Sequence, residues 1–149
     1  MTGRVLLDTN LLVYCYDRSE PHKQQRAIEL LGALASAQAG CVSTQVLAEF
    51  FTTVTRKLPV TLPPDIALDR LDHHMQIWNI LAVPGLVVRE AARGTVRHRM
   101  NFWDAQIWAA ARVNRIPLIF SEDFQHDAVL DDVRLANPFR ADFRLENYI

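Results

Sequence analysis

The chain has 149 residues, of which 50% are hydrophobic and 22% are charged, and its formal net charge is −1 at pH 7. This composition excludes a disordered tail, and the length suits one domain with its own core, which we expect to span residues 1–149. The near-zero charge excludes a strong overall attraction to nucleic acid, so polyanion binding would need local patches.

The chain shows no sign of a membrane or secretory segment. No apolar run approaches the length of a membrane span, and Asp8 interrupts the run at 5–7 too soon for a signal-peptide core. The two cysteines, Cys15 and Cys41, form neither a CxxC pair nor a zinc-binding spacing. We therefore expect a cytoplasmic protein.

Short apolar runs alternate with longer segments of helical periodicity along the whole chain. In chain order we expect a strand at 5–7, a helix at 11–16, a helix from Pro21 to Gly40, a strand at 41–43, a helix capped by Thr44 and broken at Leu58, a helix opened by Pro64, a strand at 78–83, a helix at 86–99, a helix capped by Asn101 and ending near Asn114, and strands at 118–120 and 133–135. Within the helix at 86–99, periodicity places Val88 and Val96 inward.

This alternation predicts a three-layer α/β/α fold, in which helices cover both faces of a central, mostly parallel sheet of about five strands. Ligands of such sheets bind beyond the carboxyl ends of the strands. Asp8 and Asp123 both fall where an expected strand ends. The sequence therefore directs attention to acidic residues at this edge.

Four acidic residues, Asp8, Glu49, Asp104 and Asp123, lie at or near the ends of apolar segments across nearly the whole chain. Each has a structural alternative. Asp8 can begin a turn, Asp104 can complement a helix dipole, and Glu49 can point into solvent. Asp123 also competes with the nearby Asp127 for the fourth position.

Together, the four acids predict a metal site. Carboxylates within about 4 Å repel by roughly 4 kcal/mol per pair at an effective dielectric near 20, so a convergent set needs protons or a cation. Oxygen ligands without a Cys or His grouping favour Mg²⁺, with Mn²⁺ as a substitute, over Zn²⁺. We expect Asp8 and Asp104 to hold the metal directly, and Glu49 and Asp123 to complete the outer shell, bind a second ion or orient the attacking water.

The segment at 5–12, Val-Leu-Leu-Asp-Thr-Asn-Leu-Leu, resembles the opening of a PIN domain. Segments at 43–50, 101–105 and 119–124 resemble the later acidic motifs of that family, in the same order. The short chain and the style of these motifs are most similar to the VapC toxins of toxin–antitoxin pairs. Two departures are Ser121, where Thr is frequent, and His126-Asp127, where many relatives have a Gly-containing turn.

The resemblance implies a metal-dependent endoribonuclease that hydrolyses RNA through a metal-activated water and leaves a 5′-phosphate and a 3′-hydroxyl. It also implies three partners: an RNA substrate, a VapB-like antitoxin that occupies or disorders the acidic groove, and a second copy in a homodimer. Exposed apolar residues around 62–71 permit such a dimer.

Other residues have supporting roles in this interpretation. Asn10 and Ser121 are expected to orient the carboxylates, although both could merely stabilise turns. A group of arginines before Asp104 is expected to bind substrate phosphates, with a solvated helix face as the alternative. These arginines are Arg89, Arg93, Arg97 and Arg99. Helical register favours Trp103 as a core residue.

Three other functions remain open. The chain could be a PIN module that binds RNA or a protein partner without catalysis, or an RNA-processing nuclease that is not a toxin. A haloacid dehalogenase-like phosphohydrolase also starts with an Asp at a strand exit, but its general acid would have to be Asn10, which cannot exchange a proton.

Overall fold

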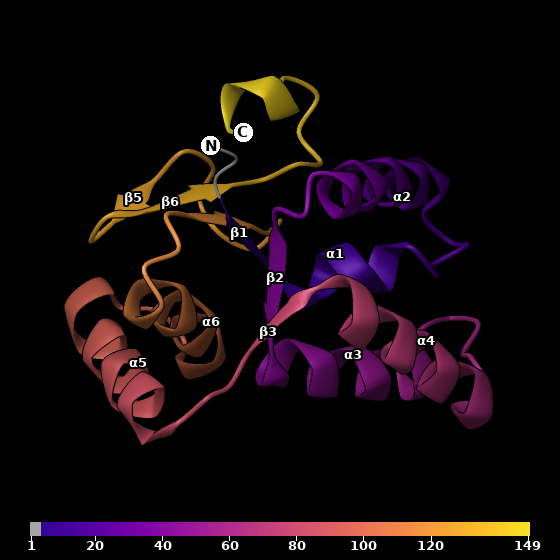
Figure 1. Ribbon diagram of the computed structural model, residues 1–149, viewed down its shortest axis with the longest axis horizontal. Coiled ribbons are helices and arrows are strands. Elements are labelled where there is room, and N and C mark those ends of the chain that lie inside the picture. Colours follow the sequence, from indigo (N-terminus) through magenta and orange to yellow (C-terminus); the bar gives the residue numbers. More distant parts are fainter. Residues whose placement is uncertain (1–3) are drawn as a thin grey trace.

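The computed structural model describes residues 4–149, so the first three residues of the expected domain lie outside the described residues (Figure 1). The elements are β1 (Val5–Leu7), α1 (Thr9–Tyr14), α2 (Pro21–Ser36), β2 (Gly40–Ser43), α3 (Thr44–Arg56), α4 (Pro64–Ile77), β3 (Asn79–Leu81), α5 (Gly85–His98), α6 (Phe102–Val113), β4 (Leu118–Phe120), β5 (Val129–Leu130), β6 (Val133–Ala136) and a 3-10 turn, η1 (Leu145–Asn147). Within these residues, no helix is long and apolar enough to cross a membrane.

The strands form one six-stranded sheet in the order β3-β2-β1-β4-β6-β5. All neighbouring pairs are parallel except β5 and β6. The helices α1 to α4 lie on one side of the sheet, and α5 and α6 lie on the other (Figure 1). This arrangement confirms the predicted three-layer α/β/α fold with one more strand than expected, because the two-residue β5 is too short to give a periodic signal.

The chain order reverses between β1 and β4, which are adjacent and parallel although more than a hundred residues separate them. Both strands are completely buried, because helices cover them on both faces. The loops that leave their carboxyl ends diverge at this point, where open α/β sheets bind ligands. Asp8 follows β1 directly, and Ser121 follows β4 directly.

On the side of the sheet opposite α1 to α4, the core is formed by the close packing of α5 against α6 (Figure 1). A Cβ atom on Gly94 would lie 2.7 Å from the ring of Trp108, so α5 can approach α6 this closely only with glycine at that position. Trp108 is fully buried, and its indole N–H donates to the Leu130 carbonyl at 3.1 Å. The pair is thereby joined to the short strand β5.

Several local expectations were wrong. Ser43, and not Thr44, caps α3, since its hydroxyl accepts the Val46 N–H at 3.2 Å. The helix α5 is rotated relative to the prediction, and it exposes Val88 and Val96. Trp103, expected in the core, is 62% exposed on α6.

Candidate active site

Asp8 is the most buried of the four predicted acids, with 3% of its surface exposed. It follows β1 directly and caps α1, where its Oδ1 accepts the Thr9 N–H at 2.6 Å. Its Oδ2 accepts the Ser121 hydroxyl at 2.6 Å. Burial raises the pKa of this carboxyl to about 7, against the lowering effect of these two hydrogen bonds.

Asp104 lies in the first turn of α6, beyond the cap that Asn101 provides. The Asn101 side chain accepts the Asp104 N–H at 3.0 Å and donates to its Oδ2 at 2.6 Å. Partial burial raises the pKa of Asp104, and the charges of Asp123 and Glu49 raise it further. The helix cap thus also fixes the carboxylate, so the structural and functional interpretations of this residue coexist.

Asp123 is exposed in the loop after β4, and Ser121 and Asn10 hold it in place. Its N–H donates to the Ser121 hydroxyl oxygen at 3.0 Å, and its Oδ2 accepts from the Asn10 amide at 3.1 Å. Ser121 itself is fully buried. Both residues predicted to orient carboxylates therefore contact Asp8 and Asp123: Asn10 donates to both carboxylates, and Ser121 donates to the Asp8 carboxylate and accepts from the Asp123 N–H.

Glu49 enters the same cavity from α3, on the opposite side. One carboxylate oxygen accepts the Thr9 hydroxyl at 2.8 Å, and the other accepts from the Gln45 amide at 2.7 Å. Gln45 in turn accepts from Gln106 at 2.8 Å. Thr9, Gln45 and Gln106 were not predicted as site residues; the spacing of Gln45 and Glu49, four apart on one helix, was the signal that could have found the first contact.

The four acids line one cavity of about 300 Å³. Ligand oxygens of Asp8, Asp104 and Asp123 all lie within 4.8 Å of one another. Within residues 4–149, no Lys or Arg side chain forms an ion pair with any of the four. An all-oxygen, negatively charged donor set without a protein cation fits Mg²⁺ or Mn²⁺.

Asp127, the alternative fourth acid, does not line this cavity. Its carboxylate accepts from Arg134 at 2.9 Å and from the Tyr148 hydroxyl at 2.8 Å. The Tyr148 hydrogen bond, with Arg134 and His126 nearby, lowers the pKa of Asp127. Position thus favours Asp123 over Asp127 as the fourth acid.

The four predicted substrate-binding arginines lie on or just after α5, and none of them lines the acidic cavity. Arg93 pairs with Glu90 at 2.5 Å, and Arg97 pairs with Asp131 at 3.3 Å. Arg89 and Arg99 are exposed. Contact between these residues and RNA stays a prediction.

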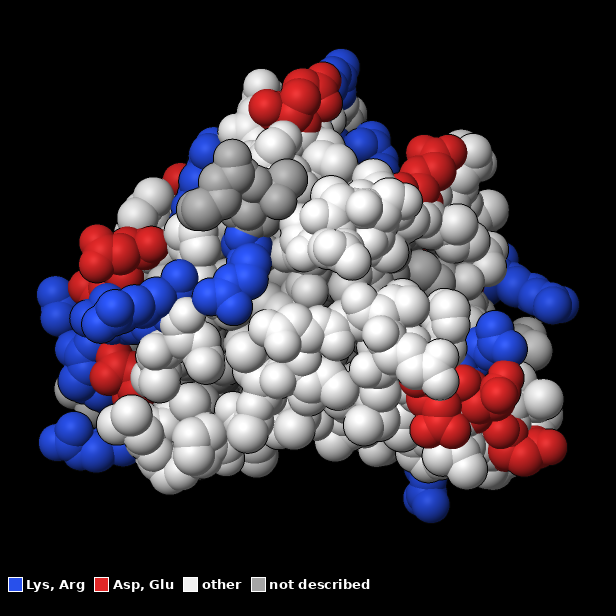
Figure 2. Space-filling view, viewed as in Figure 1, with Lys and Arg blue, Asp and Glu red and all other residues white. Residues whose placement is uncertain are grey.

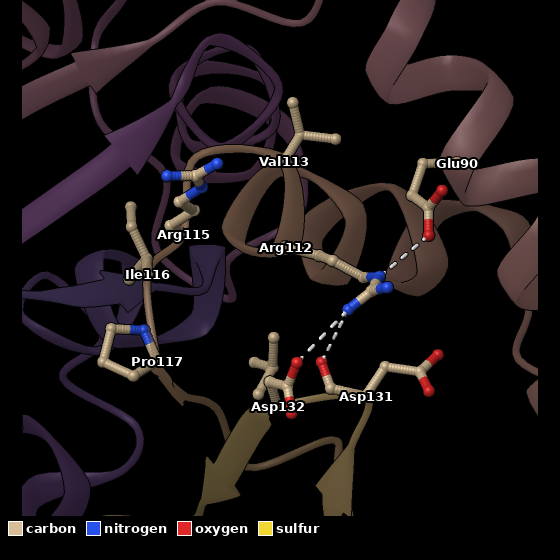
Figure 3. Close-up of a pocket in the computed structure, with 9 residues that line it drawn as sticks. Glu90, Arg112, Val113, Arg115, Ile116, Pro117, Asp131 and Asp132 are labelled. Carbon is tan, nitrogen blue, oxygen red and sulfur yellow. Dashed lines mark hydrogen bonds and ion pairs between the residues drawn. The ribbon is translucent and has the colours of Figure 1, made fainter.

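A separate cavity lies beside these ion pairs, where Arg112 bridges Glu90 and the turn at Asp131 and Asp132 (Figure 3). The turn precedes β6, and the neighbouring Pro117 precedes β4. This cavity therefore lies at the amino ends of the strands, at the edge of the sheet opposite the acids. Arg112 pairs with Glu90 and Asp132 in this cavity, which indicates a role in joining α5, α6 and the β5–β6 turn.

Comparisons with known proteins agree with this geometry. No curated protein sequence matches the chain. Solved structures similar in fold include the Mycobacterium tuberculosis VapC20, a Sarcin-Ricin loop cleaving toxin, with 20% identity, coverage of 87% of this chain and 98% of that one, and a TM-score of 0.64. DNA-bound VapBC from Salmonella typhimurium has 15% identity, coverage of 91% and 98%, and a TM-score of 0.65. A toxin–antitoxin complex from Klebsiella pneumoniae has 16% identity, coverage of 90% and 97%, and a TM-score of 0.65.

At these identities the structural likeness shows the fold alone. The family follows from the sequence, because the PIN domain model matches residues 5–130, which include all four acids. The four acids within this match line one cavity at the carboxyl edge of the sheet, where the chain order reverses between β1 and β4. The chain belongs to the PIN-domain family.

Proposed function

We propose that this chain is a Mg²⁺-dependent endoribonuclease and the toxin of a VapBC-type pair, with Mn²⁺ as a substitute metal. The observation that carries the proposal is the convergence of Asp8, Asp104 and Asp123 within 4.8 Å at the carboxyl edge of the sheet. Glu49 completes the acidic lining of the cavity. A site with this donor set and no protein cation suits phosphodiester hydrolysis.

In this proposal Asp8 and Asp104 hold the metal, and Glu49 and Asp123 bind a second ion or position the attacking water. A bound divalent cation supplies positive charge at the phosphate and lowers the pKa of a water molecule. Ser121 fixes the rotamer of Asp8, and Asn10 spans Asp8 and Asp123 through one amide group. The hydroxyl of Thr9 and the amide of Gln45 hold both oxygens of Glu49 in the cavity.

The toxin assignment adds two partners and a location. One neighbour of the same fold is described as a toxin–antitoxin complex and another as DNA-bound VapBC, which supports an antitoxin partner for this chain. A homodimer is supported by the exposed apolar side chains of α4, and a cytoplasmic location belongs to the same proposal. These apolar side chains are Ile66, Leu68, Met75 and Ile77.

Single substitutions of the metal-binding carboxylates test the chemistry. Asp8→Asn and Asp104→Asn are each expected to lower Mg²⁺-dependent cleavage of a mixed-sequence RNA pool at least 100-fold, because each removes a charged ligand. The matched control, Asp65→Asn, changes an exposed acid on α4 and should leave cleavage unchanged. Undiminished cleavage by a folded Asp8→Asn protein in EDTA would rule out the mechanism.

A further inference from the structure

A second, larger cavity of about 680 Å³ continues from the acidic cavity along α3 and the start of α6. We call it the Trp103 groove. Glu49, Thr53 and Trp103 line both cavities, so the two lie side by side. An RNA chain with one phosphate at the four acids would therefore place a neighbouring nucleotide in this groove.

Trp103 stands at the boundary between the two cavities, directly before Asp104. Its side chain is 62% exposed, whereas Trp78 is 4% exposed and Trp108 is fully buried. The Phe102 ring contacts the indole edge-to-face, with centroids 5.2 Å apart, so one aromatic ring supports another. An exposed, supported indole is a platform on which an unpaired base stacks.

Gln106 faces the groove from one turn further along α6, and only 7% of its surface is exposed. Both amide protons of Gln45 are used, by Glu49 and by the Trp103 carbonyl, so Gln45 must accept from Gln106. The orientation of the Gln106 amide is thereby fixed. Within residues 4–149, its Oε1 accepts no hydrogen bond and is not among the buried unpaired atoms, so it is accessible and can accept a hydrogen bond from a ligand in the groove.

The remaining lining suits a sugar–phosphate backbone. Lys57, at the end of α3, is exposed and forms no ion pair within the described residues. Thr52 and Thr53, which also lie on α3, line the same groove. Lys57 is thus a cation available for phosphate contact in a groove whose one acidic lining residue, among those described, is Glu49, which it shares with the acidic cavity.

We infer that the Trp103 groove binds one unpaired nucleotide next to the scissile phosphate. Its base stacks on Trp103 and donates a hydrogen bond from its edge to Gln106 Oε1, while its phosphate meets Lys57. This inference rests on the proposed nuclease function and adds to it the residue of this chain on which a substrate base stacks. Stacking is tolerant of sequence, so the groove selects unpaired structure more than a particular base.

Trp103→Ala, Trp103→Phe and the control Val129→Ala test the groove. Val129 is equally exposed but lies on β5, at the far edge of the sheet from β3. Single-stranded RNA decamers of mixed sequence should quench the tryptophan fluorescence of the wild type, because Trp103 is its only well-exposed tryptophan. Trp103→Ala should weaken binding, measured by polarisation of the labelled decamer, and raise KM on the order of tenfold with kcat little changed. Trp103→Phe should keep most of the wild-type RNA affinity, and Val129→Ala should bind and cleave as the wild type does.

A decamer series with one abasic nucleotide, moved stepwise along the strand, makes the test specific. One abasic position should weaken wild-type binding as much as Trp103→Ala does, and Trp103→Ala should lose nothing more at that position. If the wild type cleaves RNA and Trp103→Ala matches it in binding and KM, the inference fails while the function stands. If the wild type binds and is quenched without cleaving, the nuclease proposal fails while the groove stands; if it does neither, both fail.

Discussion

Asp8 makes the metal-free protein less stable as pH rises. Burial raises its folded-state pKa to about 7 from the ordinary value of 3.8, so between these values the folded state binds more protons than the unfolded state. The unfolding free energy therefore falls as pH rises through this window, and the loss is complete above about pH 7. The acidic site thus costs folding stability, which a bound cation would offset.

Asp8→Asn is accordingly expected to stabilise the metal-free protein at pH 8 by roughly 1–4 kcal/mol, since it removes a buried charge. The variant should also show a flatter stability profile between pH 4 and 7. Urea denaturation in EDTA at several pH values measures both effects. A less stable variant at pH 8 would show that the hydrogen bonds to Asp8 outweigh the cost of its charge.

Ser121 positions two acids through one buried hydroxyl, which donates to Asp8 and accepts from the Asp123 N–H. Ser121→Ala should lower Mn²⁺ affinity by roughly 10- to 100-fold, the range for partners that orient metal ligands. Ser43→Ala is the matched control, because Ser43 is equally buried and caps a helix without touching the acids. Calorimetric titration decides: equal Mn²⁺ affinity in the two variants would leave Ser121 with a turn-stabilising role only.

At the level of elements, α5 is joined to the rest of the molecule by ion pairs at the amino edge of the sheet. Arg93 and Arg112 share Glu90, and the two arginines hold the pKa of Glu90 below its usual range. Asp131, in the β5–β6 turn, accepts from His98, which lowers the pKa of Asp131. This network stabilises a turn in which Asp131 and Asp132 both adopt positive φ, a conformation that favours glycine or asparagine.

Arg93→Ala should therefore lower the unfolding free energy by about 1 kcal/mol, as expected for partly exposed pairs, and leave RNA affinity unchanged. Arg89→Ala is the control, since Arg89 is exposed and forms no ion pair within residues 4–149. Thermal unfolding and RNA binding at two salt concentrations separate the roles. Weaker RNA binding by Arg93→Ala with an unchanged melting temperature would instead support the predicted phosphate contact.

At the scale of the whole molecule, charge is unevenly distributed over the surface. A broad area without Lys, Arg, Asp or Glu crosses the middle of the face in Figure 2. The helix α4 exposes Ile66, Leu68 and Met75 to solvent at 46–53% each. Leu68 and Met75 lie seven residues apart and so share one face of α4, and exposed apolar side chains on one face agree with the proposed homodimer.

Leu68→Lys is expected to convert a dimer into a monomer, because it places a charge in an apolar interface. Ile28→Lys on α2, at a side chain with nearly the same exposure, should leave the dimer intact. Light scattering after size-exclusion chromatography gives the mass directly. A wild type that is monomeric at micromolar concentration, or a dimeric Leu68→Lys, would place the interface elsewhere or remove it.

The local pattern of the sequence determined the succession of elements and the sites where the acids occur. Buried strands such as 5–7 and 118–120 are short apolar runs, and helices repeat apolar residues with their own period, so both signals are contained in a few neighbouring residues. Alternation then required a parallel sheet, and a parallel sheet brings strand exits together. The sequence by itself therefore places Asp8 and Asp123 at one edge of the sheet.

Only the tertiary structure decided how each helix is rotated about its axis and which charges are compensated. The contact of Gly94 with Trp108 fixes the rotation of α5 against α6. The residues next to Gly94 in the sequence do not predict this contact. The same packing of the whole molecule leaves Trp103 exposed beside Asp104 and pairs Arg93 and Arg97 with acids far from the cavity. Helix rotation and charge pairing depend on contacts between residues distant in sequence, which a local pattern cannot specify.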